Sequence, residues 1–157
     1  IGIFMRRPKQ VNDIQKKLID INYHIYGSPK YLEKHGFPKS TSDLNKHSFI
    51  SFGRGAPSPV YNPDWALKLG TKDNKKRKTV MKVNSVYGLL LAVQSGVGLA
   101  ALPDYITVNQ PNIVKVLPNI EGPITEAHFV YPQSMKNVAR VQAFRNFLYS
   151  KISEWEF

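Results

Sequence analysis

The sequence has 157 residues, about one domain, and carries 22 basic against 11 acidic residues for a formal net charge of +11. That charge favours polyanionic partners. Cysteine is absent, which excludes thiol catalysis, iron–sulfur clusters and cysteine-ligated zinc. The sequence contains no run of about 20 apolar residues and no export signal, so we expect no membrane-spanning helix and a cytoplasmic protein.

The first part of the chain is predicted to hold two strands. Residues 1–4 are apolar and read as a buried strand, followed by a polar loop over residues 5–13. A complete domain rarely opens on a buried strand, so we expect the sequence to be part of a longer chain. Residues 18–26 alternate apolar and polar side chains, which is a strand pattern.

Short elements follow this strand. Ser28 is a suitable N-cap and Pro29 a suitable first residue for a helix that Gly36 ends. Residues 41–44 predict a single helical turn, and residues 48–52 a short strand.

A lysine-rich segment, residues 72–78, lies in the middle of the chain. Residues 53–59 before it are rich in glycine and proline and read as a loop. Residues 65–69 and 79–83 alternate like strands, so the lysine-rich segment is predicted to be a solvated hairpin tip. A patch that contacts phosphates is the alternative.

The next stretch predicts a βαβ unit. A strand ends at residues 82–85, a helix capped by Ser85 follows and ends near Gly96, and residues 99–102 form a short, wholly apolar strand. Asp104 then favours the start of another helix. One face of the first helix is apolar at the spacing i, i+3, i+4 and i+7, with Val86, Leu89, Leu90 and Val93.

The last third predicts two strands and a closing helix. Residues 113–117 and 127–131 are the strands. The helix is amphipathic, with an apolar face formed by Val138, Val141, Phe144, Leu148, Ile152 and Trp155.

No motif for catalysis or metal binding is present. The four histidines lack the i, i+4 spacing of a helical zinc site, and neither a nucleophile elbow nor a Walker sequence occurs. We therefore expect neither an enzyme nor a cofactor or metal.

A ligand site is better supported, at Asn84 and Ser85. These residues join the end of a strand to the start of a helix, where ligands of open α/β sheets bind. The free N–H groups of the first helical turn favour an anionic or polar group. Alternatively, Ser85 only caps its own helix.

Three blocks of sequence carry a family resemblance. Residues 27–52 hold Tyr-Leu-x-x-His-Gly-x-Pro and Asp-Leu-x-x-His, residues 83–106 hold a helix and Gly-x-Gly-x-Ala-x-Leu-Pro, and residues 128–148 hold a strand and helix. Together and in this order they resemble the effector-binding domain of LysR-type transcriptional regulators.

The resemblance implies an α/β fold like that of periplasmic binding proteins, with two Rossmann-like subdomains joined by two crossing strands. Residues 16–25 and 124–131 would be the crossing strands. Residues 1–25 and 124–157 would form the first subdomain, which is incomplete, and residues 26–123 the second. The family's DNA-binding domain is absent from this sequence.

The resemblance also implies a small-molecule effector in the cleft between subdomains. The positions that match cleft-lining ones are Ser51, Phe52 and Gly53, together with Asn84 and Ser85. A homo-oligomer is expected, with DNA bound only through the absent N-terminal domain. A solute-binding protein of a transport system and a basic nucleic-acid-binding module are the alternatives.

Overall fold

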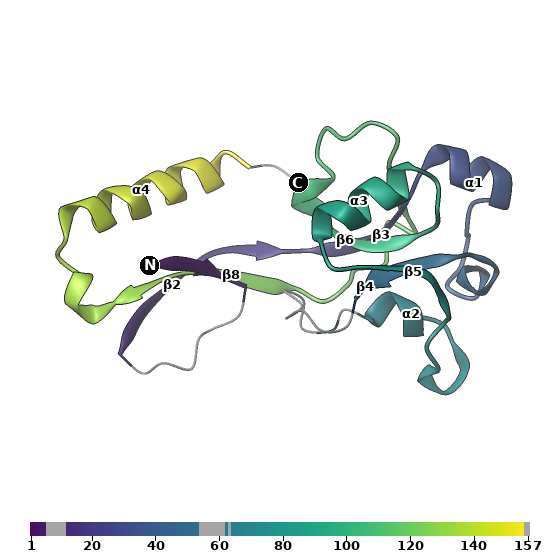
Figure 1. The fold of residues 1–157 in the computed structure, drawn as a ribbon, viewed down its shortest axis with the longest axis horizontal. Coiled ribbons are helices and arrows are strands. Elements are labelled where there is room, and N and C mark those ends of the chain that lie inside the picture. Colours follow the sequence, from purple (N-terminus) through teal and green to yellow (C-terminus); the bar gives the residue numbers. More distant parts are fainter. Residues whose placement is uncertain (6–11, 54–61, 63, 156–157) are drawn as a thin grey trace. The chain divides into compact units, whose positions relative to one another are not determined.

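The protein is described by a computed structural model that covers residues 1–5, 12–53, 62 and 64–155. The chain divides into two compact units (Figure 1). Unit 1 comprises Ile1–Ile21 and Ile124–Phe157, and unit 2 comprises Asn22–Pro123. Both units mix helices and strands, as predicted. Most of the loop predicted over residues 53–59, and residues 6–11 of the earlier loop, lie outside the described residues.

Unit 1 is a three-stranded antiparallel sheet with one helix on it. Strand β8 runs between β1 and β2, and α4 lies over the long β2–β8 pair (Figure 1). Phe129 of β8 pairs with Ile3 on one side and with Lys16 on the other. The elements are β1 (Gly2–Phe4), β2 (Asp13–Ile21), β8 (Thr125–Pro132), the 3₁₀ turn η4 (Gln133–Met135) and α4 (Ala139–Ser153).

One burial prediction for unit 1 is wrong and one is confirmed in part. The strand at the start of the chain exists, but it lies at the edge of the sheet and Ile3 is 50 % exposed. The predicted apolar face of α4 is confirmed in part: Val141 is buried against Phe129 and Tyr131, Val138 and Leu148 pack on the same cluster, and Phe144 is exposed. Trp155 lies beyond the end of α4.

The strand predicted over residues 18–26 is two strands. Strand β2 ends at Ile21, and β3 (Tyr23–Gly27) begins after Asn22. The strands have different partners, since β2 pairs with β8 whereas β3 pairs with β6 and β7. The carbonyl of Asn22 instead accepts a hydrogen bond from the amide of Asp104 at 3.0 Å.

Unit 2 holds the strands that position the candidate site. Strand β3 lies between β6 and β7 and is antiparallel to both, while β4 and β5 form a parallel pair. A parallel bridge from Phe49 to Leu99 connects the two sheets. The elements are α1 (Pro29–His35), η1 (Asp43–Lys46), β4 (Phe49–Phe52), α2 (Trp65–Lys68), η2 (Lys72–Asn74), β5 (Thr79–Val83), α3 (Val86–Gln94), β6 (Ala100–Pro103), η3 (Asp104–Ile106) and β7 (Val114–Val116).

The predicted helix boundaries of α1 and α3 are confirmed. Ser28 Oγ accepts a hydrogen bond from the amide of Tyr31 at 3.3 Å, and Ser85 Oγ accepts one from the amide of Gly88 at 3.2 Å. Each helix is followed by a glycine with positive φ, 86° at Gly36 and 78° at Gly96. These side chains and glycines satisfy helix ends in the way that their positions in the sequence indicate.

Three other secondary-structure predictions for unit 2 are wrong or shifted. Residues 65–68 are the helix α2, in which consecutive Ala66 and Leu67 are both buried, whereas a strand would turn alternate residues to opposite faces. The lysine-rich segment 72–78 is therefore not a hairpin tip. Asp104 opens only the 3₁₀ turn η3, and the predicted helical turn at residues 41–44 lies at Asp43–Lys46.

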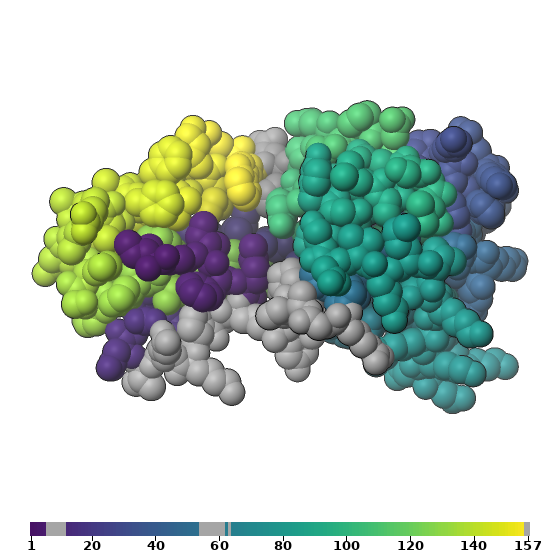
Figure 2. Space-filling view, in the orientation of Figure 1, coloured from purple at the N-terminus to yellow at the C-terminus, as the bar shows by residue number. Residues whose placement is uncertain are grey.

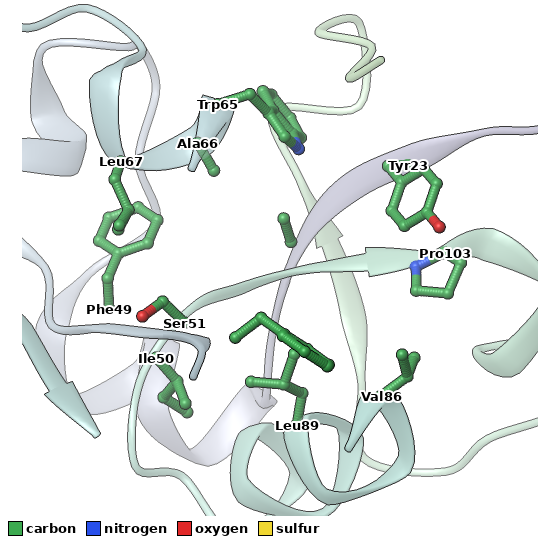
Figure 3. Close-up of a pocket in the computed structure, with 12 residues that line it drawn as sticks. Tyr23, Phe49, Ile50, Ser51, Trp65, Ala66, Leu67, Val86, Leu89 and Pro103 are labelled. Atoms are coloured by element: carbon green, nitrogen blue, oxygen red, sulfur yellow. The ribbon is translucent and has the colours of Figure 1, made fainter. Parts of the chain in front are cut away.

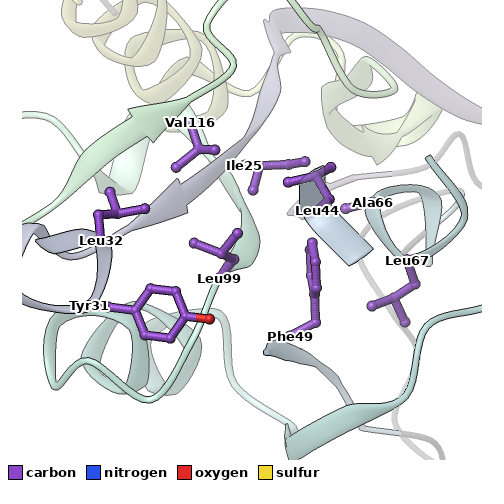
Figure 4. Packing of buried hydrophobic residues seen from close by; sticks show 9 residues of the cluster. All are labelled: Ile25, Tyr31, Leu32, Leu44, Phe49, Ala66, Leu67, Leu99 and Val116. Atoms are coloured by element: carbon purple, nitrogen blue, oxygen red, sulfur yellow. The ribbon is translucent and has the colours of Figure 1, made fainter. Parts of the chain in front are cut away.

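The core of unit 2 lies on both faces of its central strands. Successive β3 residues point in opposite directions, so Ile25 and Tyr26 belong to different hydrophobic clusters. Figure 4 shows the first cluster, in which Phe49 and Leu99 meet α1 and α2 side chains. Helix α3 covers the opposite face and buries Leu89, Leu90 and Val93. This helix links β5 to β6 as the predicted βαβ unit requires.

Candidate functional site

The structure brings the sequence-predicted site residues together at one edge of unit 2. Strands β4 and β5 are parallel and pair Phe52 with Val83, so both carboxyl ends meet at this edge. The amide of Gly53 donates to the carbonyl of Val83 at 2.9 Å. The Asn84 side chain lies directly against the α-carbon of Gly53. The grouping of Ser51–Gly53 with Asn84–Ser85 thus follows from strand register.

Burial differs among these residues. Ser51 is buried, Phe52 and Gly53 are partly buried, and Asn84 and Ser85 are exposed. The Ser85 hydroxyl caps α3, which confirms the structural role considered for it. A ligand role for any of the five residues stays a prediction.

A small pocket adjoins this edge (Figure 3). Ser51 and Phe52 line it, but Gly53, Asn84 and Ser85 are not among the described residues that do so. Its volume is about 30 Å³, room for about two water molecules. The full lining is Tyr23, Phe49, Ile50, Ser51, Phe52, Trp65, Ala66, Leu67, Val86, Leu89, Ala101 and Pro103.

Trp65 is among the pocket residues that the sequence did not indicate. Assigning residues 65–69 to a strand hid its role, since α2 is what turns the indole toward the pocket. Its ring lies on Gly122, where a β-carbon would come within 2.6 Å of Cζ2. Its Nε1 is buried and has no hydrogen-bond acceptor among the residues that the structure describes. The sequence offered one indication of this role, since Trp65 is an aromatic residue that follows a loop rich in glycine and proline.

A second polar cluster surrounds the buried carboxylate of Asp104. It accepts hydrogen bonds from the Tyr26 hydroxyl at 2.9 Å and from Lys115 Nζ at 3.2 Å, and it lies 2.9 Å from His24 Nδ1. Burial raises the pKa of the Tyr26 hydroxyl. The cluster ties β3 and β7 to the residue after β6. Each of these polar groups has a partner within the cluster.

The described residues show neither a metal-binding cluster nor a membrane-spanning helix. No group of three histidine, aspartate or glutamate side chains there could hold a metal ion. None of the helices there is long and apolar enough to cross a membrane.

The arrangement defines a class of protein. The chain passes from unit 1 into unit 2 after Ile21 and returns after Pro123. In unit 2 a pocket lies beside the carboxyl ends of parallel strands, the usual place for ligands in α/β sheets. This is a two-unit α/β domain with a pocket at the place where such sheets bind ligands.

The particular family follows from comparison with known proteins. The model of the LysR substrate binding domain matches residues 1–152, so the chain belongs to that family. An uncharacterized HTH-type transcriptional regulator of Haemophilus influenzae is 29% identical over 123 residues, which cover 76% of this chain and 41% of the relative. The HTH-type transcriptional regulator CrgA of Neisseria meningitidis is 25% identical over 141 residues, 87% of this chain and 46% of CrgA. The chain thus spans less than half the length of these relatives.

Solved structures confirm the fold. The CrgA regulatory domain from Neisseria meningitidis superposes with a TM-score of 0.80 at 22% identity, covering 96% of this chain and 74% of that domain. The effector domain of AmpR from Pseudomonas aeruginosa gives a TM-score of 0.65 at 17% identity, covering 92% of this chain and 67% of that one. The predicted periplasmic-binding-protein-like α/β fold is confirmed by these neighbours.

Proposed function

We propose that this chain is the effector-sensing part of a LysR-type transcriptional regulator, and that the effector binds where β4 and β5 end and α3 begins. The observation that carries the site is the placement of Asn84 against Gly53 beside the pocket that Ser51 and Phe52 line. The described relatives are named transcriptional regulators, which favours this reading over a transport protein.

The two units support a specific mechanism. We propose that the chain acts through the two subdomains that the resemblance implies, residues 1–25 with 124–157 and residues 26–123, with the effector in the cleft between them. A ligand that contacts both subdomains favours one of their relative arrangements over others, because it binds that arrangement more tightly. A homo-oligomer would pass this shift to DNA-binding domains outside this sequence.

The proposed role is non-catalytic. The pocket contains the hydroxyl of Ser51, but no histidine or carboxylate lies among its described lining residues to activate it. The proposed place of action is the cytoplasm, where a transcriptional regulator meets its DNA.

Asn84→Ala tests the site. The 157-residue chain would be screened against small metabolites by thermal unfolding, because a ligand that binds only the folded state stabilises it by about 2.7 kcal/mol at 100 times its Kd. We expect a hit to lose most of its effect in Asn84→Ala. Without ligand, the Asn84→Ala variant should be about as stable as the wild type, since the Asn84 side chain is exposed and does not cap α3.

A matched control is Asn119→Ala. Asn119 is also an exposed asparagine of unit 2, in a turn that does not line the pocket. It should keep the full ligand effect. Equal ligand effects in both variants would place the site elsewhere. The regulatory part of the proposal is tested with the full-length regulator. The same compound should change its binding to operator DNA, and unchanged binding would exclude this compound as the effector.

A further inference from the structure

We propose that the pocket beside the carboxyl ends of β4 and β5 takes an uncharged group of a few heavy atoms that presents a hydrogen-bond acceptor to Trp65 Nε1. A carbonyl oxygen of a ketone, amide or ester has this chemistry. The inference rests on the proposed function, and it narrows the effector to a molecule with such a terminus.

The lining excludes a charged group. None of the described residues that line the pocket is Lys, Arg, His, Asp or Glu. Phe49, Ile50 and Leu89 are among its walls, and all three are buried. A carboxylate or ammonium group placed here would lose its hydration without gaining an ionic partner, which costs far more than burying a neutral group. An anionic group, if the effector has one, therefore belongs outside this pocket, toward the exposed Asn84.

One strong donor faces this apolar space. In Figure 3 the indole nitrogen of Trp65 lies on the side of the ring that faces Tyr23 and Pro103. Trp65 Nε1 is buried, and the described residues supply no acceptor for it. Tryptophan N–H is a donor only, so the group that satisfies it must contribute an acceptor. A buried donor left unpaired is unfavourable, so an acceptor at this position gains affinity.

The donor has a fixed position. The Trp65 ring lies on Gly122, whose amide donates to the carbonyl of Tyr23 at 2.7 Å. A β-carbon at residue 122 would come within 2.7 Å of Trp65 Cε2, the atom bonded to Nε1. The absence of a side chain there lets the indole settle against β3. The N–H is thus held ready for a ligand.

The volume limits the size of the occupant. About 30 Å³ admits about two water molecules, so it admits the end of a ligand and not a whole metabolite. Ser51, at the end of β4, adds a hydroxyl that can donate to or accept from the same group.

The Trp65 indole N–H provides a direct reporter. In ¹⁵N-labelled 157-residue chain, the two indole signals belong to Trp65 and Trp155, and Trp65→Phe assigns them. The probes are 2-butanone, which is uncharged with one acceptor, and propionate, which has the same number of heavy atoms and a charge. Both are added to about 100 mM, which saturates a site with a millimolar Kd.

We expect 2-butanone to move the Trp65 indole proton downfield in a saturable way and to leave Trp155 in place. Propionate should move it at least about tenfold less. Binding of 2-butanone to the Trp65→Phe variant can be followed by the methyl signals of Val86 and Leu89. We expect this variant to bind 2-butanone about 2- to 10-fold more weakly than the wild type, because it lacks one neutral hydrogen bond.

Two results would overturn the proposal. One is a propionate shift as large as that of 2-butanone, which would show that the pocket accepts charge. The other is a Trp65 signal that neither probe moves, which would show that water alone satisfies the donor. Both are independent of the Asn84→Ala test, so the proposed effector site can stand when this assignment of ligand chemistry fails.

Discussion

The side-chain oxygen of Asn84 occupies the space that a β-carbon of residue 53 would need. A methyl group on Gly53 would lie 1.8 Å from Asn84 Oδ1. The two residues directly follow adjacent parallel strands, and the Gly53 amide is already fixed by its 2.9 Å hydrogen bond to the carbonyl of Val83. The position of the Asn84 amide group therefore depends on the absence of a side chain at residue 53.

Gly53→Ala should displace Asn84 at little cost in stability. The close atom is the end of a rotatable side chain, and φ at Gly53 is not in the left-handed region. We expect a change in unfolding free energy within about 0.5 kcal/mol and a weaker ligand effect. The check is a double-mutant cycle: in an Asn84→Ala background, Gly53→Ala should have no further effect on ligand binding. Additive losses would mean that Gly53 acts independently of Asn84.

Arg77 points back onto unit 2 and contacts three of its segments. Its guanidinium donates to Asn45 Oδ1 at 2.9 Å, to the carbonyl of Ala66 at 3.1 Å and to that of Thr41 at 3.2 Å, and it lies 5.6 Å from the Phe49 ring centre. Replacing it by lysine keeps the charge but loses the planar set of donors. We expect Arg77→Lys to lower the unfolding free energy by about 1–3 kcal/mol in urea titrations.

Lys78→Ala is the matched control for Arg77. Lys78 is exposed in the same segment, which forms part of the surface of unit 2 in Figure 2. Its loss should change stability by less than about 0.5 kcal/mol. Equal changes in unfolding free energy for Arg77→Lys and Lys78→Ala would contradict the prediction that Arg77 stabilises the fold more than the exposed lysine does.

His47 should make stability fall in mild acid. Burial chiefly, and then the charge of His35, lowers the pKa of His47 below its ordinary value of 6.5. The unfolded chain then binds more protons than the folded one, so stability is lost as pH falls below 6.5. Melting curves at about pH 7.5 and about pH 5.5 should show a smaller acid loss in His47→Phe than in the wild type.

His35→Gln tests whether the charge of His35 contributes to the lowered pKa of His47. The His35 ring stacks on the Tyr31 ring at 4.5 Å between centroids, and the His47 ring lies 5.7 Å from the same ring in a tilted arrangement. Removing the charge of His35 should raise the pKa of His47 toward the ordinary value and shrink the acid loss in part. An acid loss unchanged in both variants would assign it to other groups.

The parts of the fold that the sequence predicted depend on local chemistry. Ser28 and Ser85 start helices because their hydroxyls accept the next turn's amides, and glycines at 36 and 96 end them because they adopt positive φ. The meeting of Ser51–Gly53 with Asn84 was also predictable, since parallel strands bring their carboxyl ends to one edge.

The parts that failed depend on distant partners. Alternation at Trp65–Leu69 suits a strand, but Arg77 holds the Ala66 carbonyl from outside the segment and Gly122 receives the Trp65 ring. Neither contact can be read from the local pattern. The pocket donor was not predicted for the same reason. The buried cluster of Asp104 was not predicted either, because its partners Tyr26 and Lys115 come from other strands.

Gly122→Ala should be costly where Gly53→Ala is mild. At residue 122 the new methyl group would meet the Trp65 ring at 2.6 Å and the backbone carbonyl oxygen of Tyr23 at 2.8 Å. The oxygen belongs to β3 and the ring lines a packed pocket, so neither can rotate away as the Asn84 amide can. Such overpacking typically costs about 1–3 kcal/mol. Urea titrations of both alanine variants measure the difference in unfolding free energy. Combining Trp65→Leu with Gly122→Ala removes the clash with the indole ring and should recover part of the loss. The recovery is only partial because the clash with the Tyr23 carbonyl persists. Equal stability of the two alanine variants would show that the Trp65 ring is not held on Gly122.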